Sequence, residues 1–123
     1  MARPVGWILD AADREALLAH FPPRYAGVVA HHVTLWGHQA KAPVPPHASF
    51  AVIGHSDAGE GVEALVVLVS GQLHRPDGNH FHVTWSIDPD SGKVPRDSNA
   101  LIADHGWTEV DPVPFHAEPG YVR

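Results

Sequence analysis

The chain has 123 residues, no cysteine and a formal net charge of −6. This length favours a single domain that spans residues 1–123. The lack of cysteine excludes disulfides, thiol catalysis and cysteine-ligated zinc. The acidic balance argues against broad non-specific binding to nucleic acid, and the longest apolar run, at 64–69, is too short to cross a membrane. Because the N-terminal residues also lack a signal-peptide pattern, we expect a cytoplasmic protein.

The first part of the chain predicts a strand, a helix and a second strand. Residues 5–10 read as a short strand that leads into a helix, with Asp10 as its N-cap. The two prolines at 22–23 end this helix, because proline cannot continue the backbone hydrogen bonds. Residues 26–36 predict one strand, and the proline-rich segment 37–48 predicts a loop.

The second part of the chain predicts mostly strands joined by short turns. Residues 49–55 and 61–71 favour a hairpin, and 80–87 favour a further strand. Residues 97–106 predict a short helix with Asp97 or Ser98 as N-cap and Gly106 as its C-terminal stop. Residues 107–110 favour a last strand, and the three prolines that follow predict a mostly irregular tail. This pattern indicates an α+β fold with two helices and mostly antiparallel β-sheet.

One short segment occurs twice, as HHVTLWG at 31–37 and HFHVTWS at 80–86. Side chains alternate between the two faces of a strand, so each copy should divide into a polar and an apolar face. The predicted polar face of the second copy holds His80, His82, Thr84 and Ser86, opposite Phe81, Val83, Trp85 and Ile87. The matching face of the first copy holds Ala30, His32, Thr34 and Trp36. His31 should point the other way, toward the packed side or the strand edge.

The repeated His-Val-Thr pattern suits chemistry at a phosphate. A histidine and a threonine two residues apart on a strand lie about 6.6 Å apart and face the same way, so both can reach one phosphate. Imidazole can take or give a proton near neutral pH, and a threonine hydroxyl can donate to a phosphate oxygen. Two such pairs on facing strands would supply both a base and an acid without a metal.

The segments HVTL at 32–35 and HVTW at 82–85 resemble the His-x-Thr/Ser motifs of the two-histidine (2H) phosphoesterase superfamily. GKVPRDSNALI at 92–102 is further similar to the cyclic phosphodiesterase domain of fungal-type tRNA ligases. The resemblance implies a compact bilobal fold with pseudo-two-fold symmetry. It also implies metal-independent opening of a 2′,3′-cyclic phosphate on a nucleotide or RNA end, with no cofactor. His32 and His82 would then be the acid and base, and Thr34 and Thr84 would hold the phosphate.

Two other functions fit the same residues. His80, His82 and His32 could ligate a transition metal in a cupin-like β-protein, although no glutamate follows the pair shortly afterwards and the predicted helix does not suit a small barrel. The domain could also bind a nucleotide or RNA end without catalysis. Trp36 and His80 are candidate substrate contacts, the first by stacking on a base or ribose. We expect Trp85 in the core, and the cations Arg75, Lys93 and Arg96 at the surface.

Overall fold

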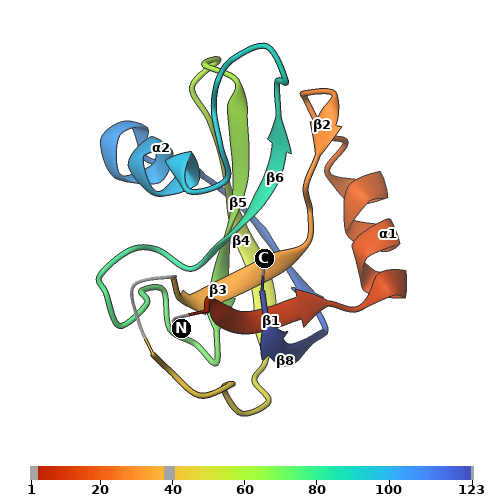
Figure 1. The fold of residues 1–123 in the computed structure, drawn as a ribbon. Coiled ribbons are helices and arrows are strands. Elements are labelled where there is room, and N and C mark those ends of the chain that lie inside the picture. Colours follow the sequence, from red (N-terminus) through yellow and green to blue (C-terminus); the bar gives the residue numbers. More distant parts are fainter. Residues whose placement is uncertain (1–2, 38–40, 123) are drawn as a thin grey trace.

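A computed structural model describes residues 3–37 and 41–122 and has the α+β architecture that the sequence predicts, with two helices and two antiparallel sheets (Figure 1). The smaller sheet has the order β3-β1-β8 and the larger one the order β2-β6-β5-β4-β7. The strands of the smaller sheet are β1 (Val5–Leu9), β3 (His32–Trp36) and β8 (Ala117–Tyr121). Those of the larger sheet are β2 (Gly27–Val28), β4 (Phe50–Asp57), β5 (Val62–Val69), β6 (His82–Ile87) and β7 (Thr108–Phe115).

The two helices begin and end close to the predicted positions. Helix α1 (Ala11–His20) starts at Asp10, whose carboxylate accepts a hydrogen bond from the Asp13 N–H at 3.1 Å, as predicted. Helix α2 (Asp97–His105) ends at Gly106, which has a φ of 71°. Its N-cap, however, is Arg96, and no side chain caps it, so the predicted cap at Asp97 or Ser98 is wrong. Neither helix is long and apolar enough to cross a membrane.

The larger sheet packs on both of its faces. On one face, Leu65, Val67 and Trp85 join Val33 of the smaller sheet and Leu17 of α1 in the main core. On the other, Val62 and Val66 pack against Leu101 and Ile102 of α2. The two helices therefore lie on opposite sides of the molecule (Figure 1). Burial of each such side chain stabilises the fold by about 1.5–3 kcal/mol.

The predicted strand over 26–36 is broken at Ala30, where the chain leaves the larger sheet and enters the smaller one. Up to this point it pairs with β6, and the Ala30 N–H donates to the Thr84 carbonyl at 3.0 Å. Ala30 then has a φ of 43°, a conformation that costs a residue with a side chain about 1 kcal/mol or more. It lies in the main core instead of sharing a face with His32, so that part of the prediction is wrong. Beyond this break β3 still contacts β6, which brings the two repeated segments together.

A bulge in β6 changes the predicted face of its last residues. Glu63 of β5 pairs with Ser86, whereas the next residue, Ala64, pairs with Thr84, so β6 carries one extra residue here. Ser86 therefore points to the side of Glu63, not to that of His82 and Thr84 as predicted. Ile87 likewise packs on the α2 side instead of joining the main core.

The strand predicted at 107–110 is present as the start of β7, but the predicted irregular tail is wrong, because β7 continues to Phe115 and β8 covers Ala117–Tyr121. Proline cannot donate a backbone hydrogen bond, which usually confines it to the edge of a sheet. Both strands are edge strands: β7 pairs only with β4, and β8 pairs only with β1. Pro112, Pro114 and Pro119 are thus compatible with strands that have one unpaired edge.

Candidate functional site

The two His-Val-Thr segments line one cleft of about 150 Å³. His32 and Thr34 reach it from β3 of the smaller sheet, and His82 and Thr84 reach it from β6 of the larger sheet. Val33 and Val83, between them, point into the main core as alternation predicts. The remaining lining residues include Arg75, Arg96 and Asn99. The cleft thus combines two imidazoles, two hydroxyls and two guanidinium groups.

His82 is the more constrained histidine. Its side chain is buried, and its Nδ1 lies 2.9 Å from the carbonyl oxygen of His80. Because a carbonyl can only accept, Nδ1 carries the proton and neutral His82 has its lone pair on Nε2. Burial, and then the positive charge of Arg75, lower the pKa of His82 to about 4. His82 is therefore neutral at pH 7 and able to accept a proton.

His32 is also neutral at pH 7. Burial and the nearby His31 and His82 lower its pKa to about 4. Its Nδ1 lies 3.0 Å from Nδ1 of His31, with the two rings nearly perpendicular at 80°. His31 is exposed and so does not face the packed side, but its ring contacts the ring of His32, a contact that the alternation did not predict.

The two threonines differ in the hydrogen bonds they make. Thr84 Oγ1 donates to the carbonyl of Pro95 at 3.1 Å and lies 2.9 Å from the Ser98 hydroxyl. Its single proton is thus engaged in holding the start of α2, and it must rotate before it can donate to a phosphate. Thr34 Oγ1 has no hydrogen bond with the residues the structure describes and lines the same cleft. Thr34 is the better placed of the two as a phosphate donor.

Arg75 is a cleft residue that sequence reasoning assigned to the surface. Its side chain is only 7% exposed and is held by the carboxylate of Asp77, which accepts from both Nε and Nη2. Hydrogen bonds from Arg75 keep the pKa of Asp77 below its usual value despite partial burial. The third nitrogen, Nη1, makes no hydrogen bond with the described residues. An arginine followed two residues later by aspartate, just before the second motif, is the signal that could have indicated it.

Asn99 is a second cleft residue that the sequence did not assign to the site. It lines the cleft from α2, and its Oδ1 is the one buried side-chain nitrogen or oxygen of the described residues that lacks a hydrogen-bond partner. An unpaired buried acceptor costs about 1–3 kcal/mol, so this oxygen favours the arrival of a donor from a ligand or from water.

The two candidate substrate contacts lie outside the lining of this cleft. Trp36 is half-buried at the end of β3. The ring of His80 stacks obliquely on that of His74, with centroids 4.6 Å apart, and its edge meets Trp107. The alternative metal set of His80, His82 and His32 is thus not assembled. Among residues 3–37 and 41–122, no three histidine, cysteine or acidic side chains converge as metal ligands.

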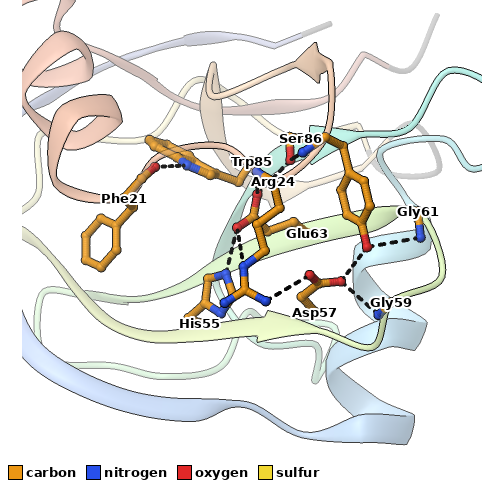
Figure 2. A network of polar contacts seen from close by, with 10 residues as sticks. Phe21, Arg24, His55, Asp57, Gly59, Gly61, Glu63, Trp85 and Ser86 are labelled. Atoms are coloured by element: carbon orange, nitrogen blue, oxygen red, sulfur yellow. Dashed lines mark hydrogen bonds and ion pairs between the residues drawn. The ribbon is translucent and has the colours of Figure 1, made fainter.

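A second cavity, of about 440 Å³, opens beside a buried carboxylate, that of Glu63. Both of its oxygens have partners (Figure 2): Oε1 accepts from the Ser86 hydroxyl at 2.6 Å and from the backbone N–H of Arg24 at 3.0 Å, and Oε2 lies 2.7 Å from His55 Nε2. Burial raises the pKa of Glu63, but the bonds from His55 and Ser86 outweigh it and leave the pKa below its usual value. Glu63 joins β4, β5, β6 and the segment after α1, which is a structural role.

We expect the protein to lose stability as the pH falls from 6.5 toward 4. His32 and His82 have folded pKa values of about 4, below the usual value of 6.5 for an unfolded histidine. Between these values the unfolded chain binds more protons than the folded one, so acid favours unfolding. The burial of each histidine should lower the free energy of unfolding by on the order of 2 kcal/mol at pH 5.

Urea unfolding at pH 7 and pH 5 measures this loss of stability, and the loss between the two pH values should be smaller in a His82→Gln variant. Equal free energies of unfolding at both pH values would contradict the described burial.

Comparison of the chain with protein-family models, with curated proteins and with solved structures found no match. The site is therefore interpreted from its own geometry: two neutral imidazoles, brought together by two different sheets, beside a buried arginine.

Proposed function

We propose that the protein is a metal-independent cyclic phosphodiesterase that opens a 2′,3′-cyclic phosphate on a nucleotide or an RNA end. The observation that carries this proposal is the convergence of His32 and His82 from separate sheets on one cleft that also holds Arg75. We further propose that the reaction takes place in the cytoplasm.

The reaction requires two proton transfers at one phosphorus atom. One imidazole takes a proton from the attacking water, and the other delivers a proton to the oxygen that leaves the ring. Arg75 Nη1 and the Thr34 hydroxyl are available to donate to the non-bridging oxygens, where negative charge develops. Asp77 holds the Arg75 side chain in place, so this donor is oriented before the substrate binds.

The size of the cleft supports recognition of the phosphate end and not of the base. Its volume of about 150 Å³ is below the roughly 300–1,000 Å³ of ordinary small-molecule pockets. The cyclic phosphate and part of the ribose fit such a space, and the base would lie outside. With Trp36 away from the cleft, we expect weak discrimination between the four nucleobases.

The proposal is tested by incubating the protein with 2′,3′-cyclic AMP, GMP, CMP and UMP, and with an RNA that ends in a cyclic phosphate, all in EDTA. The expected result is conversion to a monophosphate that phosphorus NMR identifies, at similar rates for the four nucleotides. Turnover that requires an added transition metal would instead favour the metal alternative. Tight binding without turnover would favour a non-catalytic nucleotide or RNA-end binding domain.

Replacing Arg75 by alanine should raise KM for a cyclic nucleotide by about 10-fold or more, because a charge-assisted hydrogen bond to phosphate contributes about 1.5–3 kcal/mol. Arg75→Lys keeps the charge but loses the fixed planar fork, so it should recover only part of the loss. Steady-state kinetics measures both variants against Lys41→Ala, which removes an exposed cation outside this cleft. An Arg75→Ala variant with unchanged KM and kcat would remove Arg75 from the site.

A further inference from the structure

The contact between His31 and His32 joins a solvent-exposed histidine to a histidine of the cleft. Their Nδ1 atoms lie 3.0 Å apart, and only a proton between them can make this contact a hydrogen bond. His31 is exposed just before β3, whereas His32 is half-buried and lines the cleft. When His31 donates, His32 must carry its own proton on Nε2, the nitrogen left for the cleft.

With His31 as the donor, the two cleft histidines hold opposite tautomers. His82 donates Nδ1–H to the His80 carbonyl at 2.9 Å and keeps a lone pair on Nε2, which suits a base. His32, with His31 as donor, presents Nε2–H, which suits an acid. A neutral imidazole is a poor acid alone, because losing its only proton would leave an anion. A second proton, supplied to Nδ1 of the same ring, removes this difficulty.

We propose that His31 is a proton-relay residue that makes His32 the general acid of the reaction, an inference that rests on the proposed function. Water forms a bond to phosphorus and gives one proton to His82 Nε2. The bond from phosphorus to the leaving oxygen breaks, and that oxygen takes the proton from His32 Nε2. The Nδ1 proton of charged His31 moves to His32 Nδ1 in the same step. The step begins with His31 as the one charged histidine and ends with His82 as the one charged histidine. Solvent then returns a proton to His31 and takes one from His82.

The electrostatics of the cleft favour this division of roles. Burial and the neighbouring His31 and His82 keep His32 uncharged at neutral pH, so it holds no spare proton of its own. At His82, burial disfavours the charged form and the hydrogen bond to the His80 carbonyl favours it. Arg75 and the His80 ring add to the first effect, and Asp77 adds to the second. The exposed ring of His31 can carry a solvated charge and exchange its proton directly with water.

The test compares His31→Gln and His31→Leu in the full-length protein, with 2′,3′-cyclic AMP in EDTA. Glutamine can still donate an N–H to His32 Nδ1 and hold its tautomer, but it cannot release a proton. We expect kcat to fall about 10-fold or more in both variants with little change in KM, since a proton transfer typically contributes about 10²–10⁴-fold. Because the relay requires a transferable proton on His31, it predicts an alkaline decline of kcat in the wild type that His31→Gln lacks.

The outcomes of these variants separate the relay from simpler accounts. A fully active His31→Gln variant would overturn the relay, because orientation alone would then suffice. A slow variant that keeps the wild-type alkaline decline would overturn it too. His47→Gln, which changes another exposed histidine, should match the wild type. Absence of turnover by the wild-type protein would refute the proposed function itself, whereas wild-type turnover with an unaffected His31→Leu variant refutes only the relay.

Discussion

Replacing His82 by alanine is expected to lower kcat/KM for 2′,3′-cyclic nucleotides by about 10²–10⁴-fold, the usual contribution of one proton transfer. The neutral ring of His82, with its proton held on Nδ1 by the His80 carbonyl, leaves Nε2 free to accept a proton in the cleft. His32→Ala should cause a loss of similar size, because the leaving oxygen then receives no proton from the protein. Steady-state hydrolysis assays measure both effects.

His82 is buried, so its replacement could also affect folding. His82→Asn is the matched variant, because its side-chain amide can still donate to the His80 carbonyl while offering no base. It should fold as the wild type does in thermal unfolding and remain as slow as His82→Ala. His105→Ala, at an exposed position outside the cleft, should be fully active. A folded His82→Asn protein with the wild-type rate would mean that His82 is not the base.

Glu63→Ala is expected to lower the free energy of unfolding by several kcal/mol, because each buried polar group left without its partner costs about 1–3 kcal/mol. The substitution leaves the Ser86 hydroxyl, the Arg24 N–H and His55 Nε2 without their common acceptor (Figure 2). All three come from different parts of the chain, so the loss loosens their connection. Urea denaturation with circular dichroism measures this change.

Glu60→Ala is the control for Glu63, because Glu60 lies in the adjacent turn and forms only an exposed ion pair with His105. Such surface pairs contribute about 1 kcal/mol or less, so this variant should unfold nearly as the wild type does. Glu63→Gln, which keeps the shape but not the charge, should fall between the two. A Glu63→Ala protein as stable as Glu60→Ala would show that the buried network does not stabilise the fold.

Local sequence patterns predicted the features that depend on local chemistry. Asp10 caps α1, Gly106 ends α2, and the alternation of Val83 and Trp85 with His82 and Thr84 places the apolar side chains in the core. These features are set by capping, by left-handed backbone and by the two-residue period of a strand, all of which can be seen in a short window of sequence.

The features that the sequence did not predict depend on pairing between distant segments. The bulge that turns Ser86 toward Glu63 requires β5 and β6 to be paired first, and the change of sheet at Ala30 requires both sheets. The prolines after residue 110 indicated a loop because sequence alone does not show that β7 and β8 are edge strands.

The site was incomplete at the sequence level for the same reason. Arg75 looked like a surface cation in a turn until its pairing with Asp77 and its burial were known. His31 was placed on the far side by strict alternation, but its ring reaches His32. The proton of Thr84, assigned to a phosphate, is engaged by the Pro95 carbonyl.

The central claim is that both His-Val-Thr segments close on one phosphate, and histidine NMR during a titration with adenosine 2′-monophosphate tests it most directly. The account predicts that resonances of His32 and His82 shift together along one binding curve. Their pKa values should also rise from about 4, because a bound anion favours the charged imidazole. A response from only one of the two histidines, or from neither at saturating nucleotide, would contradict a shared site.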